Sequence, residues 1–268
     1  MRLLIYLCKK TFMAKIIAIT NNKGGVGKTT TTLNLGAALV KLGQKTLLID
    51  LDPQANLTTS FGIDEKNQSH IGSFLLGEKN WGDILVQKQD GVLFDLLPSS
   101  NHLLESEEKL SLRPMREGIL SKKLSSHKKD YDFILIDCPP SLGLLTNNAL
   151  FASDDFIVPI QAEFFAYKGI TNLINHILTL NQESGAEINF LGILLVKYNE
   201  NMKERLVQGI AQKVREGSQG DKVFQSSIKQ DKNLKESPLA GQDIFEYAPE
   251  SNGAKDYLLL AKEILAQI

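Results

Sequence analysis

The segment from residue 22 to residue 30, Asn-Lys-Gly-Gly-Val-Gly-Lys-Thr-Thr, has the residue types of a phosphate-binding loop. Glycine lets the backbone curl until several N–H groups point at phosphate oxygens. Lys28 is placed to reach the β- and γ-phosphates of a nucleotide, and the Thr29 hydroxyl is placed to ligate Mg²⁺. We therefore predict a nucleotide site formed by Lys23, Gly24, Gly25, Val26, Gly27, Lys28, Thr29 and Thr30.

This loop departs by one residue from the standard pattern of glycine, any four residues, glycine, lysine and then serine or threonine. Asn22 stands where the pattern has its first glycine, and an additional lysine, Lys23, precedes the glycine pair. A glycine-rich turn that binds nothing is the alternative interpretation. Two lysines, three glycines and a threonine between an apolar run and a helical pattern favour the phosphate site.

Acidic residues follow two further apolar runs. Asp50 and Asp52 stand at the end of the run 45–50, and Asp137 closes the run 133–137. Ligands of open α/β sheets bind beyond the carboxyl ends of the strands, so we expect these carboxylates to face the phosphates. Asp137 has the position of an acid that holds Mg²⁺ through water. Without the glycine loop, each aspartate would be interpreted as a cap or turn residue.

Alternating apolar runs and helical patterns must position these groups. We expect strands at residues 15–20, 45–50, 92–97, 133–137, 156–160 and 190–196, and helices at 29–42, 168–181, 201–216 and 253–267. Continuously apolar strands that alternate with helices indicate an α/β fold with a mostly parallel, twisted sheet and helices on both faces. The prediction is a single-domain P-loop NTPase fold. The polar stretches 64–70 and 121–130 are expected to be surface loops.

Composition narrows the function classes. The 268 residues include 30 Lys and Arg against 31 Asp and Glu, which excludes a uniformly basic nucleic-acid-binding protein but not a local basic patch. The two cysteines are not at metal-ligand spacing, so Cys138 is expected to pack as a small apolar residue. No apolar run reaches the length of a transmembrane helix.

The first twelve residues are interpreted as an N-terminal extension that need not be native, because Met13 opens a natural start followed by a strand. Their short apolar stretch ends at two lysines, which does not fit a secretory signal. A short arm that touches a membrane or a partner is the alternative interpretation.

Five ordered blocks of the chain resemble the ParA/Soj family of partition ATPases, within the deviant-Walker-A class of P-loop proteins that also contains MinD. The blocks are NNKGGVGKTTTTLNLGAAL, LLIDLDPQANLT, FILIDCPPSLGLLTNNAL, VPIQAEFFAYKG and LKESPLAGQDIFEYAPESNGAKDY. They cover nearly the whole sequence from Met13, so residues 13–268 are expected to form one ParA-like ATPase domain.

The resemblance implies a mechanism. Similar proteins bind ATP and Mg²⁺, close face to face as homodimers and bind double-stranded DNA without sequence preference. They hydrolyse ATP slowly until a ParB-type partner stimulates them, which implies a cytoplasmic, nucleoid-associated protein. The implied catalytic residues are Lys23, which would reach the partner's nucleotide, Lys28, Asp52, which would position the attacking water, and Asp137. Thr29, Asp52 and Asp137 would hold the metal, and Asp50 and Pro139 would complete the nucleotide site.

Two stretches of excess positive charge are candidates for a DNA surface. Residues 197–235 contain nine Lys and Arg against five Asp and Glu, and residues 109–129 contain seven against one. Either stretch alone fits an ordinary solvated face. The resemblance favours the later stretch, with Lys203, Arg205, Lys229, Lys232 and Lys235 as candidates. Residues 228–234 lack two arginines that are usual in the family, which leaves the DNA contacts and the adenine pocket undefined.

Rival functions of the same class make different demands on the sequence. A membrane-positioning ATPase like MinD would need a basic amphipathic terminal helix, whereas residues 257–268 hold one lysine and one glutamate, so no membrane association is expected. An iron–sulfur carrier would need cysteine ligands that the sequence lacks. A ParA-like ATPase that positions a protein cargo would have the same core, and this alternative stays open.

Overall fold

The computed structural model describes residues 13–64, 69–87, 94–161, 166–184, 187–198, 212 and 222–268. The extension predicted at residues 1–12, and all but one residue of the helix predicted at 201–216, lie outside the described residues. Within the described part of the chain, no helix is both long enough and apolar enough to span a membrane.

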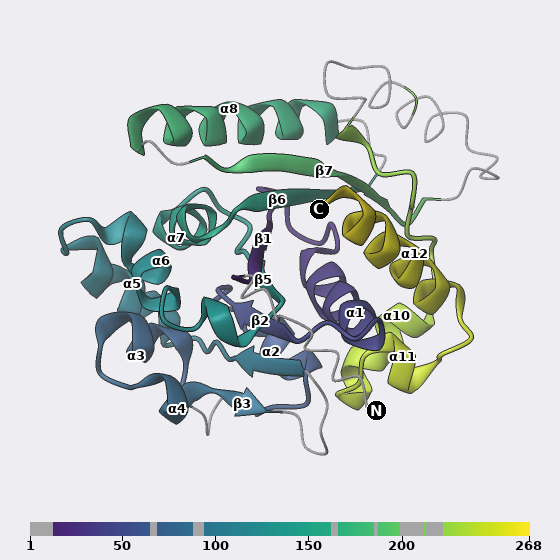
Figure 1. Ribbon diagram of the computed structural model, residues 1–268, viewed down its shortest axis with the longest axis horizontal. Coiled ribbons are helices and arrows are strands. Elements are labelled where there is room, and N and C mark those ends of the chain that lie inside the picture. Colours follow the sequence, from purple (N-terminus) through teal and green to yellow (C-terminus); the bar gives the residue numbers. More distant parts are fainter. Residues whose placement is uncertain are drawn as a thin grey trace, which may run out of the picture.

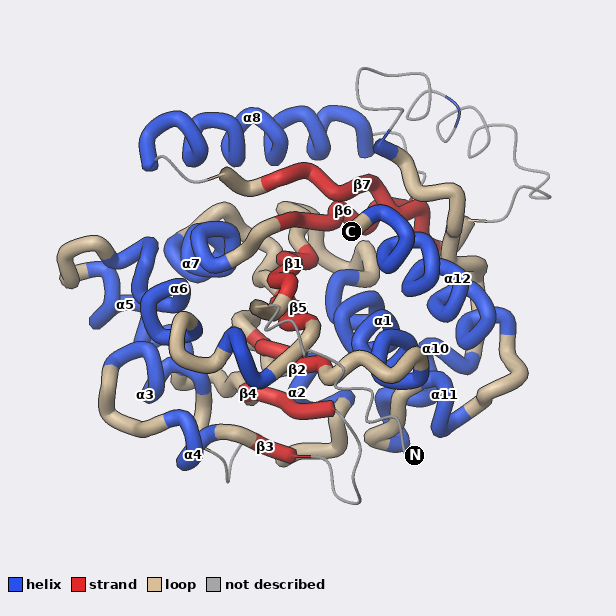
Figure 2. Tube along the Cα trace, in the orientation of Figure 1, coloured by secondary structure: helices blue, strands red, loops and turns tan. Residues whose placement is uncertain are grey.

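Seven strands form one sheet in the order β3-β4-β2-β5-β1-β6-β7 (Figures 1 and 2). All neighbours in this sheet pair in parallel except β3, which runs antiparallel to β4 at the edge. The mostly parallel sheet predicted from the sequence is therefore confirmed. The strands are β1 (Lys15–Ile19), β2 (Thr46–Asp50), β3 (Val86–Gln87), β4 (Phe94–Leu97), β5 (Phe133–Asp137), β6 (Asp155–Gln161) and β7 (Asn189–Val196).

Helices cover both faces of the sheet, as predicted. In Figure 1, α1, α10, α11 and α12 lie on one side of the central strands, and α3 to α7 lie on the other. The helices are α1 (Lys28–Lys41), α2 (Asn56–Ser60), α3 (Ile71–Leu76), α4 (Trp81–Ile84), α5 (Leu103–Ser111), α6 (Ile119–Leu124), α7 (Leu144–Ala152), α8 (Ala166–Ser184), α10 (Asn233–Glu236), α11 (Ile244–Tyr247) and α12 (Asn252–Gln267).

The central strand β1 explains why the strands read as continuous apolar runs. Ile16 and Ala18 pack into one hydrophobic cluster with α3 and α5 to α8, whereas Ile17 and Ile19 pack into a second cluster with α1 and α12. All four side chains are fully buried. Successive side chains of a strand point to opposite faces, so a sheet covered on both sides needs an apolar residue at every position.

One sequence expectation is wrong. Residues 121–130 are not a loop, because α6 extends to Leu124 and a short 3₁₀ turn covers Lys128–Asp130. Leu120 and Leu124 are four residues apart and therefore lie on one face of the helix, and both are fully buried. The polar residues between and after them make this helical pattern easy to miss in the sequence. Cys138 is fully buried among apolar side chains, as expected.

Candidate nucleotide-binding site

The glycine loop lies between the carboxyl end of β1 and the start of α1. Both neighbours of β1 in the sheet contribute to its surroundings: β5 ends at Asp137, and β6 ends at Gln161. Strand β2 pairs with β5 so that Asp50 lies opposite Asp137. The parallel sheet thus brings four separate segments of the sequence together at one edge, and the sequence predicted this for three of them, the glycine loop, Asp50 and Asp137.

The backbone of the loop can adopt its shape only with glycine at two positions. Gly25 has φ of 72° and Gly27 has φ of 85°, in the left-handed region that other residues rarely enter. A Cβ atom at Gly24 or Gly25 would meet no other atom within 4 Å, so open space lies above this turn. Gly27 is also the N-cap of α1 and has no side chain to bond the first N–H groups. Those donors and the helix dipole suit an anion.

The two lysines of the loop occupy different environments. Lys28 is buried, and its ammonium donates a hydrogen bond to the carbonyl oxygen of Lys23 at 3.1 Å. Burial lowers the pKa of Lys28, and the negative charge of Asp137 opposes that shift. Lys23 is exposed, and its backbone N–H donates to the side-chain oxygen of Asn21 at 3.0 Å.

Thr29 and Asp137 meet at the centre of the site. The Thr29 hydroxyl donates to Oδ2 of Asp137 at 2.7 Å. The other carboxylate oxygen of Asp137, Oδ1, is buried without a hydrogen-bond partner. Burial raises the pKa of Asp137 well above its usual value, and the nearby Asp50 raises it further. A buried carboxylate oxygen with no donor, beside a threonine hydroxyl, fits the ligand set of a magnesium ion and its waters.

Asp50 has its oxygens occupied by the protein itself. Oδ2 accepts hydrogen bonds from the backbone N–H and the hydroxyl of Thr58, and Oδ1 accepts one from the backbone N–H of Asp52. Burial nevertheless raises the pKa of Asp50 to about 7. Asp50 therefore fastens the start of α2 to the end of β2, next to Asp137.

Asp52 and Pro139 lie at the same edge of the sheet. Asp52 is buried, its Oδ1 accepts a hydrogen bond from the N–H of Gln54, and its carbonyl oxygen accepts one from the Ser99 hydroxyl. Pro139 is buried directly after Cys138. The structure thus gathers the loop residues and the three carboxylates that the sequence singles out.

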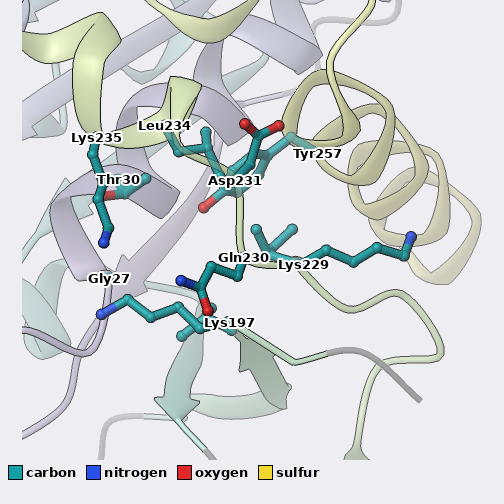
Figure 3. Close-up of a pocket in the computed structure, with 11 residues that line it drawn as sticks. Gly27, Thr30, Lys197, Lys229, Gln230, Asp231, Leu234, Lys235 and Tyr257 are labelled. Atoms are coloured by element: carbon teal, nitrogen blue, oxygen red, sulfur yellow. The ribbon is translucent and has the colours of Figure 1, made fainter. Parts of the chain in front are cut away.

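A pocket opens beside the loop and continues the site toward the C-terminal part of the chain (Figure 3). It begins at Gly27 and Thr30 and ends at Tyr257 of α12. Its other lining residues come from the end of β7 and from the segment that follows the long undescribed stretch: Val196, Lys197, Ile228, Lys229, Gln230, Asp231, Leu234 and Lys235. Residues 228–235, whose role the sequence leaves undefined, therefore form one wall of a pocket at the phosphate loop.

The predicted DNA contacts do not form one group. Lys203 and Arg205 lie outside the described residues. Lys229 is bound to the buried Asp256, whose oxygens accept from both its ammonium and its backbone N–H at 2.8 Å. Its side chain points toward α12 in Figure 3. Lys232 and Lys235 are exposed, although Lys235 also lines the pocket.

Two positioning residues carry no signal in the loop motif itself. The side-chain amide of Gln161 donates to the carbonyl oxygen of Gly25 at 2.7 Å, and that of Asn21 donates to the carbonyl oxygen of Pro159 at 2.8 Å. Both bonds fasten the glycine loop to β6. From the sequence, Gln161 is assignable only to the scaffold or an interface, because its loop partner is 136 residues away.

Comparisons with known proteins agree with this geometry. A family model described as an AAA domain matches residues 14–190. The sporulation initiation inhibitor protein Soj of Bacillus subtilis is 39% identical over 95% of this chain and 99% of its own length. The chromosome-partitioning ATPase Soj of Thermus thermophilus is 38% identical over 94% and 96%, and the chromosome partitioning protein ParA of Caulobacter vibrioides is 36% identical over 94% of each.

Solved structures give the same result. A Mycobacterium smegmatis protein described as cobyrinic acid a,c-diamide synthase, with bound ADP and magnesium, is 33% identical, with a TM-score of 0.82 over 95% of each chain. The cell division ATPase MinD of Pyrococcus furiosus is 28% identical, with a TM-score of 0.75 over 96% of this chain and all of its own. The family resemblance drawn from the sequence blocks is confirmed: this chain belongs to the Soj/ParA family of P-loop ATPases.

Proposed function

We propose that this ATPase is a partition switch. It binds ATP and Mg²⁺ at the loop between β1 and α1, forms a homodimer in the ATP state, and binds double-stranded DNA without sequence preference in that state. A ParB-type partner stimulates hydrolysis, which separates the dimer and releases the DNA. The relatives described as chromosome-partitioning proteins support this proposal.

The loop and its neighbours have the groups that phosphoryl transfer needs. The backbone of residues 24–27 and the N-terminus of α1 bind the phosphates, and Lys28 lies at the base of this cradle. Thr29 and Oδ1 of Asp137 would hold Mg²⁺, directly or through water. When bound, Mg²⁺ would supply positive charge that offsets the negative charge of the phosphates. Asp52 orients the attacking water, while Asp50 holds Asp52 and α2 in place.

The observation that carries the dimer proposal is the difference in burial between the two lysines of the loop. Lys28 is buried and faces the inside of the loop, whereas Lys23 is exposed beside open space. An exposed lysine there can reach a nucleotide held by a second copy. A cation supplied from outside would stabilise charge that develops during phosphoryl transfer.

Lys23→Ala tests this role. The variant should bind ATP within a fewfold of the original protein, because Lys28 remains, but should stay monomeric with ATP in analytical ultracentrifugation. Lys41→Ala, an exposed lysine at the end of α1, is the matched control and should dimerise normally. Normal dimerisation by Lys23→Ala would refute the proposed role across the interface.

Asp52→Ala tests whether Asp52 positions the attacking water. Removing a group that positions the nucleophile should slow hydrolysis by about a hundredfold or more while ATP binding persists. The ATP-bound dimer should therefore last longer than that of the original protein in a time course by size-exclusion chromatography. Turnover at the original rate would show that another residue positions the water.

A switch that positions a protein cargo, rather than DNA, would use the same ATPase core. Stimulation of ATP hydrolysis by a purified DNA-bound ParB-type protein would support DNA partition. Stimulation by a cargo protein alone, with no binding to duplex DNA, would favour the alternative.

A further inference from the structure

The segment between α5 and α6 contains a feature that neither the ATPase site nor the proposed DNA surface uses. Two large apolar side chains, Leu112 and Met115, are 86% and 87% exposed. They flank Arg113 and Pro114 in a turn where Met115 has φ of 51°. We call residues 112–116 the apolar turn.

The apolar turn is firmly held. The guanidinium of Arg116 donates to the carbonyl oxygen of Ser111 at 2.9 Å, and that of Arg113 donates to the carbonyl oxygen of Leu76 at 2.8 Å. The carbonyl oxygen of Arg116 accepts a hydrogen bond from Asn148 of α7 at 2.8 Å. Leu112 and Met115 are thus presented to the outside by an ordered backbone that is tied to three helices, and not by a fraying end.

Basic residues are concentrated in the segment that contains the apolar turn. Residues 109–129 hold seven Lys and Arg against one acidic residue, Glu117. Lys122, Lys123 and Arg113 converge on a hollow of about 550 Å³ whose apolar walls include Leu75 and Ile119. No ion pair within the described part of the chain involves Lys122 or Lys123.

The ammonium of Lys123 is constrained. It lies 4.5 Å from the centre of the Phe74 ring. Burial lowers the pKa of Lys123, and the neighbouring charges of Arg113 and Lys122 lower it further. An anion in the hollow would relieve this repulsion among the three cations.

We propose that the apolar turn and the basic hollow form a docking surface for an anionic phospholipid membrane. The hollow would receive lipid phosphates, and Leu112 and Met115 would enter the boundary between headgroups and acyl chains. Contact of this kind is peripheral and needs no spanning helix.

Other occupants fit the surface less well. Duplex DNA offers phosphates but gives no apolar environment to Leu112 and Met115. A protein interface favours Arg over Lys, whereas five of the seven cations between residues 109 and 129 are lysines. A lipid surface can contact both the exposed apolar side chains and the lysines, because it deforms and needs no complementary shape.

This surface is separate from the proposed DNA candidates. Helices α5 and α6 pack against one face of the sheet, and α10 and α12 pack against the other. Figure 1 shows the two groups at opposite ends of the view. The sequence-based expectation of no membrane association considers only the C-terminal helix. It does not consider residues 109–129, which the sequence alone shows as a stretch of excess positive charge.

Flotation of the full chain with lipid vesicles, without nucleotide, tests the proposal. The protein should float with vesicles of equal parts phosphatidylglycerol and phosphatidylcholine at low salt, and should not float with phosphatidylcholine alone. The double variant Leu112→Ser/Met115→Ser should lower the vesicle partition coefficient by about tenfold or more. Lys122→Glu/Lys123→Glu should abolish flotation.

Two exposed residues elsewhere supply matched controls. Leu239→Ser removes an apolar side chain that is 89% exposed, and Lys262→Glu reverses an exposed charge on α12. Both should float like the original protein. Equal binding to neutral vesicles, or unchanged flotation of both double variants, would overturn the proposal. A loss of DNA binding that is confined to the double variants would also overturn it, because it would assign the surface to DNA. Binding of soluble polyglutamate that is lost only in the double variants would assign the surface to an acidic protein instead.

Discussion

The buried ammonium of Lys28 has a single hydrogen-bond partner among the described residues, the carbonyl oxygen of Lys23 at 3.1 Å. Nucleotide phosphates would give it a much stronger partner. Lys28→Ala should therefore abolish ATP binding, dimer formation and hydrolysis together, as measured by fluorescent-nucleotide binding and phosphate release. Unchanged nucleotide affinity in this variant, alongside a normal fold by circular dichroism, would contradict the loop assignment.

Asp50 and Asp137 make the nucleotide-free protein sensitive to pH. Burial raises the pKa of both carboxyls, that of Asp50 from 3.8 to about 7. Between these values the folded chain binds more protons than the unfolded chain. The free energy of unfolding should therefore fall as pH rises from about 4 to about 7, by at most about 1.4 kcal/mol per pH unit for one group.

Urea unfolding without nucleotide across that pH range measures this slope. Asp50→Asn should reduce the slope, because the amide cannot ionise. Glu250→Gln, at a side chain that is 92% exposed, should leave it unchanged. A stability that rises with pH across the same range would show that the aspartates are not held in their protonated form.

At the scale of elements, Asn34 ties the middle of α1 to α11 in the C-terminal part of the chain. Its side-chain amide donates to the carbonyl oxygen of Thr30, and its Oδ1 accepts from the N–H of Ile244, both at 2.8 Å. Asn34 is fully buried. Asn34→Ala should lower the free energy of unfolding by about 1 to 3 kcal/mol, because it leaves the N–H of Ile244 without its hydrogen-bond partner.

Asn175→Ala is the matched control for that variant. Asn175 is exposed on α8, and its replacement should change the free energy of unfolding by no more than about 0.5 kcal/mol. Equal effects of the two substitutions in urea unfolding would show that the link between α1 and α11 contributes nothing.

The elements around the site could be predicted from the sequence because each carries a strong local signal. The run 133–137 matches β5 at both ends, and the glycines of residues 24–27 mark the turn between β1 and α1. Helix α6 could not be predicted in this way, because its apolar pattern consists of only Leu120 and Leu124 among polar residues. The bonds of Gln161 and Asn34 could not be predicted either, since their partners lie 136 and 210 residues away.

At the scale of the whole molecule, the sequence predicted the α/β P-loop fold but not which basic surfaces face outward. Lys229 shows the reason. Its charge counts toward a DNA patch in the sequence, yet its ammonium is bound to Asp256, a buried residue of α12. Residues 109–129 show the reverse case, since this basic run, which by itself fits an ordinary solvated face, contains two exposed apolar side chains, Leu112 and Met115.

Lys232 is the clearest described candidate for a DNA contact, because it is exposed and does not line the pocket beside the glycine loop. Lys232→Ala should weaken binding to duplex DNA equally for all sequences and lower the salt slope by about one for each DNA phosphate that this lysine neutralises. ATP binding should be unchanged. An unaltered salt slope would remove Lys232 from the DNA surface.

The measurement that tests the central claim most directly is binding to random-sequence duplex DNA with ATP, with ADP and without nucleotide, each at two salt concentrations. The switch predicts binding only with ATP, and a steep loss of affinity at the higher salt because phosphate contacts dominate. Equal binding in all three nucleotide states, or no binding in any of them, would contradict it.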